Sequence, residues 1–479
     1  MKKMLKSLSL FVVLTLLFLG LNKNVYAKKI DAIRYGGSDF DSFNDIIVDG
    51  NEIVAVGSTS SKNIEGLNNT SDKSVGLIVK YSNKKVVWQT IKTNDESSYI
   101  QFNSIIKANN GYLVIAEQSY SYLYKYDNNG KLLWEKKADG TYVKIIDSGD
   151  GNYIIVGNKK VSSENVPFIL KIDNDGNILK RTEFTSSEDE GTYDDYTTSN
   201  VVRNSNGDYA ITLSARAGFA GIVCVDNNLN KKWENLELAT TVNPQISDIA
   251  VNKLGNYVLA GYNHEMSTPS SLSSKKDDFG YILEIDSSNG ELLSTIKAQN
   301  SDGSMKYPIS RFRSIISYKD YYLVFGEAGD IEILDNISFW QLPKKLFLFS
   351  AVDKENVKKG QLIEVQDVSD YIADFLVVTK FKLINVGDNE IYMSYIFDGE
   401  KDMFGTKALG GSSDAAILHI SDVFDSIKKD DSKTDDNKGE VVDVPDTLSN
   451  TSVAVIIGGS ALVLLGVATY FFTTKKNSI

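Results

Sequence analysis

The sequence predicts an all-β fold, a seven-bladed β-propeller closed by an N-terminal strand, followed by a C-terminal transmembrane helix. Pairs of apolar segments around short Gly, Asn or Asp turns recur through most of the 479 residues. Tyr (25) and Phe (21) are abundant while Pro (6) is scarce, a composition that favours strands. A long apolar segment near the C-terminus is separated from the repeats by a charged linker.

The N-terminus has the pattern of a secretory signal peptide. Lys2, Lys3 and Lys6 precede an apolar run, and small residues end at Ala27. Residues 1–27 are therefore predicted to be removed, so that the mature chain begins near Lys28. The alternative is a retained anchor helix, but the apolar run is shorter than a typical membrane span.

The first half of each repeat contains two apolar segments separated by a tight polar turn. Clear copies are "FNDIIVDGNEIVAVGSTSS" from Phe43, "FNSIIKANNGYLVIAEQSY" from Phe102, "SDIAVNKLGNYVLAGYN" from Ser247 and "FRSIISYKDYYLVFGEA" from Phe312. A second pair of segments follows, as in "YLYKYDNNGKLLWEKK". Gly and Asn tolerate positive φ, so these turns are typical of β-hairpins. Four antiparallel strands repeated every roughly 40–60 residues predict propeller blades.

Seven copies begin near residues 42, 99, 141, 194, 245, 308 and 374, and they define a propeller domain of residues 28–427. The last copy ends with "AAILHISDVFD" and lacks a fourth strand. At the other end of the chain, "IDAIRYG" stands where an outer strand stands in the other repeats. Residues near 29–36 are therefore predicted to complete the seventh blade, which would leave no open sheet edge.

The repeats resemble bacterial β-propeller repeats of the "GGS–D–F–x–x–I" and "YDxNGxxxW" type, including the PQQ-like propellers. The resemblance covers roughly Lys29 to Asp425. The Trp of the outer strand is present as Trp88, Trp134 and Trp233, and Leu or Ile replaces it in other copies. The resemblance implies the fold, whereas function has to be argued from a site, because propellers host many activities.

Long, irregular segments predict which face of the propeller binds a ligand. They are residues 58–74, 185–198, 263–279, 326–345 and 398–414. All of them connect the second strand to the third, or one blade to the next, so they belong to one face. Function usually lies on variable loops over a rigid scaffold, and we expect the site at this face and the channel mouth.

One of these segments offers candidate ligand contacts. "NISFWQLPKK" places Phe339 and Trp340 near Lys344 and Lys345. An exposed aromatic group flanked by cations could anchor a partner. The alternative is a loop that is packed over its own blade.

The sequence matches none of the catalytic and metal-binding motifs considered next, which favours a protein that is not an enzyme. The "DNDGN" turn at Asp173 lacks the Gly and Glu of a calcium-binding loop, so Asp173 and Asp127 are predicted to be turn residues. The chain has two His and a single Cys, Cys224, which are too few to make a zinc site or a nucleophile–His pair a good prediction. We predict no catalytic, metal or cofactor-binding residues, and Cys224 as an inert core residue.

The tail is predicted to tether the propeller outside the cell. Residues 428–452 are a flexible charged linker, Val453 to Phe472 are long enough to cross a bilayer, and residues 473–479 are a basic cytoplasmic end. This order resembles a Gram-positive cell-wall sorting signal. Its pentapeptide is Val444, Pro445, Asp446, Thr447 and Leu448. Pro and Thr match the L-P-x-T-G pattern, while Leu448 stands at the place of Gly.

Together these features predict an exported propeller on the surface of a Gram-positive-type bacterium, anchored in the membrane or covalently in the wall. Its partners would be a protein or glycan ligand and, for the tail, a sortase. The formal charge of −12 argues against nucleic acid, whose phosphates need clustered Lys and Arg. The alternatives are an enzyme of glycan or quinone chemistry and a scaffold for the assembly of other surface proteins.

Overall fold

The computed structural model describes residues 29–421. The gaps are 94–98, 162–163, 185–195, 216–219, 239–243, 264–279, 298–308, 319–320, 330–344, 353–361, 368–381 and 386–389. These residues belong to a unit that spans Met1–Ser426, and a second unit, Ile427–Ile479, lies outside the description. No helix of the described residues is long and apolar enough to cross a membrane. The predicted transmembrane helix at 453–472 falls outside them.

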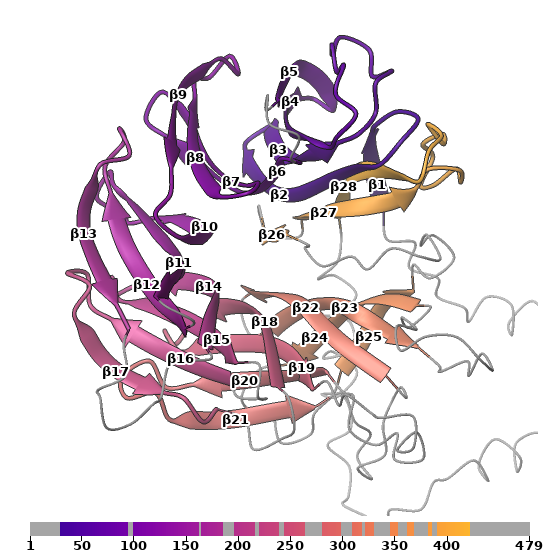
Figure 1. Cartoon of the computed structure of the whole chain (residues 1–479). Coiled ribbons are helices and arrows are strands. Elements are labelled where there is room, and N and C mark those ends of the chain that lie inside the picture. Colours follow the sequence, from indigo (N-terminus) through magenta and orange to yellow (C-terminus); the bar gives the residue numbers. More distant parts are fainter. Residues whose placement is uncertain are drawn as a thin grey trace, which may run out of the picture. The chain divides into compact units, whose positions relative to one another are not determined.

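The described strands form seven antiparallel four-stranded sheets (Figure 1). Six of them are blades of four consecutive strands. Sheets 1 to 3 are β2 (Asp41–Asp49), β3 (Glu52–Thr59), β4 (Val75–Ser82) and β5 (Lys85–Lys92); β6 (Gln101–Ala108), β7 (Gly111–Glu117), β8 (Ser121–Tyr126) and β9 (Leu132–Lys137); β10 (Thr141–Asp147), β11 (Tyr153–Val161), β12 (Glu164–Ile172) and β13 (Ile178–Glu183).

Sheets 4 to 6 follow the same order. They are β14 (Tyr196–Arg203), β15 (Tyr209–Ala215), β16 (Ala220–Val225) and β17 (Lys231–Asn235); β18 (Pro244–Val251), β19 (Tyr257–Asn263), β20 (Gly280–Ile285) and β21 (Leu292–Lys297); β22 (Ile309–Tyr318), β23 (Tyr321–Gly329), β24 (Lys345–Val352) and β25 (Leu362–Asp367). The remaining sheet, here called the closing sheet, joins β1 (Lys29–Tyr35) to β28 (Ser413–Ser421), β27 (Glu390–Asp398) and β26 (Leu383–Asn385).

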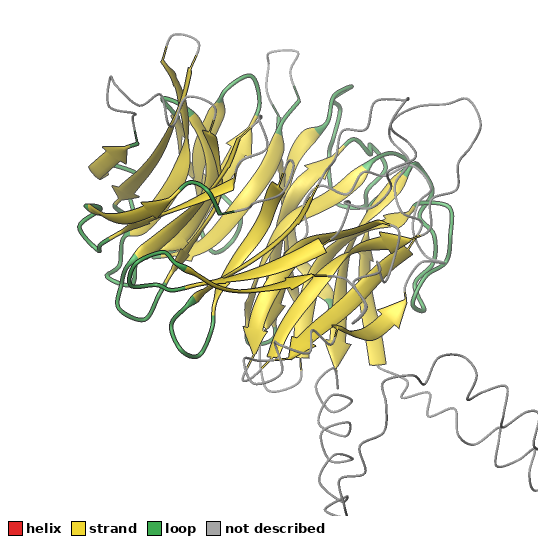
Figure 2. Ribbon diagram, turned by 90° about the horizontal axis from the view of Figure 1, so that it is seen from below, coloured by secondary structure: helices red, strands yellow, loops and turns green. Residues whose placement is uncertain are grey.

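The sheets are arranged in a ring. The innermost strands β2, β6, β10, β14, β18, β22 and β26 contact one another in that order, and β27 contacts β2. Figure 2 shows that the described chain consists of strands joined by loops. The predicted all-β propeller class is confirmed. The last repeat was predicted to begin near residue 374, which lies outside the described residues, and its first described strand is β26 from Leu383.

The predicted pairing of the two chain ends is confirmed. β1 lies antiparallel to β28 in an unbroken register from Lys29 opposite Ser421 to Tyr35 opposite Ala415. A buried ion pair ties the same strands, because Arg34 Nε donates to Asp414 Oδ2 at 2.5 Å. Arg34 Nη1 also donates to the Lys401 carbonyl at 2.6 Å.

A second buried carboxylate lies at the same junction. Asp41 is fully buried, and its Oδ2 accepts hydrogen bonds from the Gly37 N–H and from Ser61 Oγ, each at 2.8 Å. Burial raises the pKa of Asp41 to about 6, and the negative charge of Asp414 adds to the effect of burial. The junction therefore combines one buried guanidinium group with two buried carboxyl groups.

The hydrophobic core lies between successive sheets. Val56 and Ile78 of sheet 1 pack with Phe102 and Tyr112 of sheet 2 in one continuous cluster. At the junction, Ala415 and Ile417 of β28 belong to the same cluster as Phe43 and Leu77 of sheet 1. Packing across sheets stabilises the ring because each sheet buries its faces against its neighbours. Cys224 is a buried free thiol in one of these clusters, as predicted for an inert core residue.

The Asp-x-x-Gly turns are structural, as predicted. Asp173 Oδ1 accepts hydrogen bonds from the backbone N–H groups of Asp175 and Asn177 at 2.9 and 2.8 Å. Asp127 and Asp226 make the same pair of bonds in their turns. No group of three metal-ligating side chains occurs among the described residues. The carboxylates thus stabilise hairpins, as in an Asx turn.

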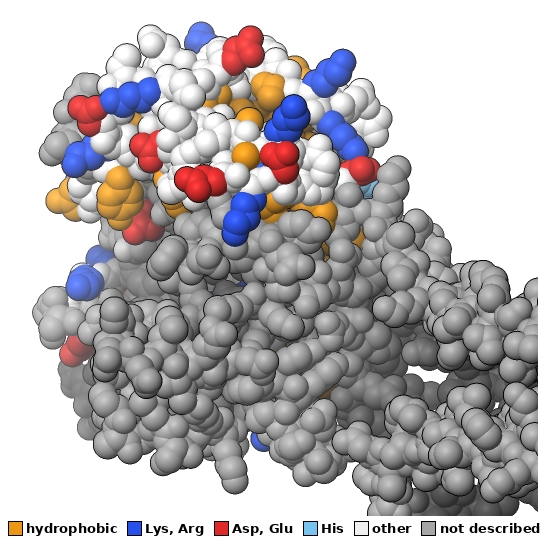
Figure 3. Space-filling view, turned by 90° about the vertical axis from the view of Figure 1, so that its right-hand side faces the viewer, with side chains coloured by type: hydrophobic (Ala, Val, Ile, Leu, Met, Phe, Trp, Pro, Cys, Tyr) orange, Lys and Arg blue, Asp and Glu red, His pale blue; other side chains and the backbone are white. Residues whose placement is uncertain are grey.

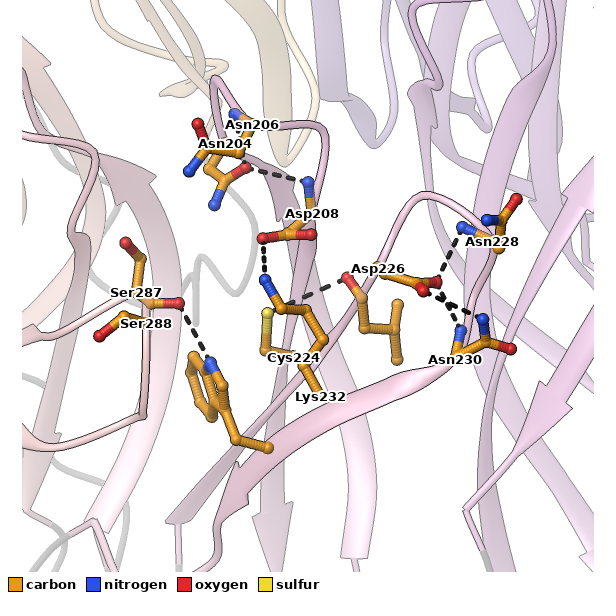
Figure 4. Close-up of polar contacts among 12 residues, drawn as sticks. Asn204, Asn206, Asp208, Cys224, Asp226, Asn228, Asn230, Lys232, Ser287 and Ser288 are labelled. Carbon is orange, nitrogen blue, oxygen red and sulfur yellow. Dashed lines mark hydrogen bonds and ion pairs between the residues drawn. The ribbon is translucent and has the colours of Figure 1, made fainter.

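Tryptophan side chains of two outer strands form hydrogen bonds to the next sheet, and Figure 4 shows Ser287, whose carbonyl accepts one of these bonds. Trp233 of β17 donates its indole N–H to the Ser287 carbonyl of sheet 5 at 3.0 Å. Trp88 of β5 makes the equivalent bond to the Asn128 carbonyl of sheet 2 at 2.9 Å. The outer-strand Trp of the repeat therefore acts at the periphery of the propeller, far from its axis.

We expect Arg34→Met to destabilise the protein by about 3 kcal/mol or more, because the Asp414 carboxylate would be left buried without its cation. Urea unfolding of the purified chain, followed by tryptophan fluorescence, measures this. The matched control is Lys84→Met, which removes an exposed ion pair to Asp31 of the same strand and should cost less than about 1 kcal/mol. Equal effects of the two substitutions would contradict the proposed importance of the buried junction.

Candidate functional site: a polar central cavity

A repeated backbone irregularity shapes the centre of the propeller. The innermost strands β2, β6, β10, β14, β18 and β22 each contain a β-bulge two or more residues after the strand begins. The extra residues are Asn44, Asn103, Val143, Ser199, Ser247 and Arg313. All of them line one cavity. A bulge bends the strand and re-aims a side chain, and here the repetition gathers these residues around the axis.

The bulge explains a glycine in the second strand of several repeats. Gly57 lies opposite Phe43, the residue before the bulge of β2. A Cβ at Gly57 would lie 1.9 Å from the Ser42 carbonyl oxygen, which is too close for any side chain. Gly157, Gly261 and Gly326 face equally close carbonyl groups in their own sheets. Each of these glycines therefore lies in the second strand of its sheet, opposite the bulge of the first strand.

The cavity has a volume of about 350 Å³. Besides the bulge residues, it is lined by Glu117 at the end of β7, Tyr262 near the end of β19, and Lys382 just before β26. The starts of first strands and the ends of second strands are joined to the long connections of each repeat. The cavity therefore lies toward the face that was predicted to carry the binding site.

Two carboxylates organise the polar lining by binding across sheets. Asp45 Oδ2 accepts hydrogen bonds from Ser104 Oγ at 3.0 Å and from the Ile105 N–H at 3.1 Å, both in sheet 2. Lys144 of sheet 3 reaches the same oxygen with its Nζ at 2.7 Å. One carboxylate of sheet 1 thereby holds two further sheets.

Asp248 of sheet 5 repeats this arrangement. Its Oδ2 accepts hydrogen bonds from Ser314 Oγ at 2.6 Å and the Ile315 N–H at 3.1 Å, in sheet 6. Its Oδ1 accepts from Asn200 Nδ2 at 2.7 Å and the Ile249 N–H at 2.9 Å. The two carboxylates thus accept hydrogen bonds from backbone N–H groups close to bulges, namely those of Ile105, Ile249 and Ile315.

Asp45 is held in its charged form. Burial opposes ionisation, but the ammonium groups of Lys144 and Lys382, with hydrogen bonds from Lys144 Nζ and the Ile105 N–H, outweigh burial and lower the pKa of Asp45. A carboxylate that stays ionised cannot serve as the general acid of a glycosidase, which needs a raised pKa. Asp45 is thus a structural anion.

Other polar groups of the lining are less completely matched. Asn103 Nδ2 donates to Glu117 Oε2 at 2.9 Å, whereas the buried Asn103 Oδ1 accepts no hydrogen bond from the described residues. Arg313 lies over the ring of Tyr262 at 4.8 Å and donates to its hydroxyl at 3.2 Å. The lining therefore offers an acceptor, cations and an aromatic group within one small cavity.

The residues singled out from the sequence are mostly not in this cavity. Phe339, Trp340 and Lys344 lie outside the described residues, and Lys345 begins β24 with its side chain outside the description. The segment 326–345 was expected to be a loop throughout, but β23 continues to Gly329. The sorting-like pentapeptide, Val444 to Leu448, also lies outside the described residues.

Sequence reasoning missed the cavity residues themselves. The signal was present, because the residue after the first aromatic of a repeat is Asn44, Asn103 or Arg313, a polar residue between apolar ones. Strict alternation treats such a residue as an ordinary outward-facing strand position. Only the register shift in the paired strands reveals that it is an inserted residue that faces the axis.

Similarity to known proteins is found among solved structures. No protein-family model and no curated protein sequence matches it. Solved structures similar to it include Sqt1 from Chaetomium thermophilum (11% identity, 82% of this chain and 98% of that chain, TM-score 0.47). Others are the polysaccharide lyase Uly1 (11%, 81% and 91%, 0.47) and YCF48 bound to D1 peptide (12%, 83% and 96%, 0.46). Fold and site together define a β-propeller repeat protein with a polar central cavity.

We expect Asp45→Asn to destabilise the protein by about 3 kcal/mol at pH 7, because Lys144 loses its buried counter-charge. The lowered pKa of Asp45 gives stability that is present above the pKa of the unfolded chain and is lost as pH falls through the lower folded pKa. The difference between the variant and the original protein should therefore shrink below about pH 4. Urea unfolding at a series of pH values measures it.

The matched control is Asp127→Asn in an exposed turn. Asn204 makes the same kind of turn between β14 and β15, with its Oδ1 accepting from the Asn206 and Asp208 N–H groups. We expect a change within about 0.5 kcal/mol for Asp127→Asn. A loss at Asp45 that is no larger than the control would show that the Asp45–Lys144 pair does not stabilise the centre.

Proposed function

We propose that this protein is a non-catalytic binding protein of the bacterial cell surface, and that its ligand enters the central cavity from the long-loop face. One observation carries the proposal: the bulges of successive innermost strands place side chains from separate sheets around a single cavity of about 350 Å³. That volume is at the small end of ligand pockets, which measure about 300–1,000 Å³.

The hydrogen bonding of the carboxylates supports binding over catalysis. Glycoside hydrolysis needs a carboxylic acid with a raised pKa and a second carboxylate free to act as base or nucleophile. Asp45 is held as an anion, and Asp248 accepts four hydrogen bonds from the protein. Both groups are occupied in joining sheets. Ligand binding needs no such acid–base pair. It requires only that the remaining polar groups of the lining form hydrogen bonds with the ligand.

The position of the cavity supports entry from the long-loop face. Asn44 and Asn103 stand near the starts of their strands, and Glu117 and Tyr262 stand at or near the ends of theirs. On the opposite face, the hairpin turns are short, such as Gly50-Asn51 and Asn83-Lys84. The long connections are joined to these strand ends in the chain, and we expect them to add ligand contacts, including those of Phe339 and Trp340.

A cavity-filling variant tests the site. We expect Ser247→Trp to abolish binding of any ligand found for the full chain on an array of glycans and matrix-protein peptides, because the indole would occupy the cavity. Ser205→Trp, in the exposed turn between β14 and β15, is the matched control and should keep binding. Circular dichroism checks that both variants fold. Unchanged binding by folded Ser247→Trp would place the ligand site outside the cavity.

The surface location is proposed from the two ends of the sequence. A signal peptide at residues 1–27 would export the chain, and the apolar segment 453–472 would hold it at the membrane with the propeller outside. The pentapeptide from Val444 to Leu448 would make it a sortase substrate if Leu448 is accepted in place of Gly. The linker 428–452 would then keep the propeller away from the membrane or wall.

Mass spectrometry of the protein from the expressing bacterium distinguishes the two anchors. We expect a C-terminus at Thr447 in wall-released protein, since the sorting pattern is cut after its Thr. Thr447→Ala, which keeps the apolar segment, should leave the protein in the membrane fraction. An intact Ile479 in membrane-bound protein would show a plain membrane anchor, and protein free in the medium with Ile479 would contradict both.

A further inference from the structure

We propose that the cavity recognises an acidic sugar, namely a terminal uronate residue of a polysaccharide. This inference rests on the proposed function and names the class of its ligand. A uronate combines one carboxylate with several hydroxyl groups on a small ring. The cavity offers a cationic side, hydrogen-bonding groups and two tyrosines in a volume that suits a chain end.

The cationic side is formed where sheet 3 and the closing sheet meet the Asp45 carboxylate. Lys144 pairs with Asp45 at 2.7 Å, and Lys382 is close enough that its charge also acts on both groups. Asp45 is the ion-pair partner of Lys144, and the charge of Asp248 also acts on Lys144, so the charge of Lys144 is offset within the protein. No hydrogen bond or ion pair of the Lys382 ammonium group is found among the described residues. A ligand carboxylate would give this ammonium group an ionic partner.

A third cation extends this side. Arg313 lines the cavity from β22, the strand that contacts β26 just after Lys382. Its guanidinium group is held over the Tyr262 ring, which fixes its position at the wall. Arg presents several N–H donors in a plane that fits a carboxylate. Arg313 and Lys382 thus come from neighbouring strands and can act on the same anion.

The hydroxyl-binding side is indicated by Asn103. Its Nδ2 is fixed by Glu117, which leaves the buried Oδ1 as an acceptor without a donor among the described residues. A buried acceptor without a partner destabilises the folded protein, so a ligand hydroxyl that donates to it would remove that cost. Gln245, Ser247 and Thr141 line the same cavity with further amide and hydroxyl groups.

A peptide carboxyl terminus is the competing class, because it also carries an anion and N–H donors. Protein ligands usually bury apolar and aromatic side chains at the centre of the contact. Here Val143 and Ile246 are the aliphatic residues in a lining otherwise made of polar groups and tyrosines. On the face shown in Figure 3, the described Lys and Arg side chains are interspersed with Asp and Glu, so they form no separate cationic patch there.

Calorimetry on the purified full chain tests the inference. The probes are glucuronate, galacturonate, glucose, acetate and an acetylated dipeptide with a free carboxyl terminus. We expect a uronate to bind at least about tenfold more tightly than glucose or acetate, since a charged hydrogen bond contributes about 1.5–3 kcal/mol. Lys382→Met should weaken uronate binding about tenfold or more and leave glucose unchanged, whereas Lys382→Arg should retain most of it.

The matched control is Lys131→Met in an exposed turn, which should not change uronate binding. Equal binding of uronate and glucose, or unchanged uronate binding by Lys382→Met, would overturn the acidic-sugar inference. Tighter binding of the dipeptide would replace it with peptide recognition. In each of these cases the proposed function stands if Ser247→Trp abolishes the binding. If no probe binds, the ligand class is wrong, and Ser247→Trp with the array ligand still decides the proposed function separately.

Discussion

Antiparallel pairing of β1 with β28 is the contact on which the ring depends. The two strands join residues about as far apart as the described chain allows, since Arg34 and Asp414 are separated by 380 positions. Closing so long a loop costs chain entropy, although the cost grows only slowly with length. Seven paired positions, the buried Arg34–Asp414 ion pair and a shared apolar cluster offset that cost. Without the pairing, β28 and sheet 1 would each leave an uncovered edge or face.

The bulge of the innermost strands is the second constraint, and it links stability to the site. It excludes side chains at Gly57 and its equivalents, and it leaves backbone N–H groups that need acceptors. Asp45 and Asp248 supply these acceptors across sheets. The charges at the axis are therefore part of the architecture. In the proposed function, a ligand would contact Lys382, Arg313 and the Asn103 side chain, which line the same cavity.

Local sequence patterns made the strands predictable but did not identify the residues that line the cavity. The hairpins could be read because an Asp or Asn side chain and a glycine with positive φ fix each turn within five residues, as at Asp173 and Gly176. The closure could be read because one repeat lacked a strand that the other end of the chain supplied. The cavity residues could not, because Asn44 and Ser247 are unremarkable in sequence and gain their role from a one-residue register shift.

The sequence by itself determined the all-β class, the order of the repeats, the turn chemistry and the pairing of the chain ends, because these depend on alternation and on residues close together in the chain. It also drew attention to the long-loop face. The tertiary structure alone decided which side chains meet at the axis. Lys144 reaches Asp45 across an intervening sheet, and Asn200 reaches Asp248 from the neighbouring one. Such contacts follow from how a ring of twisted sheets brings its first strands together, and no local pattern encodes them.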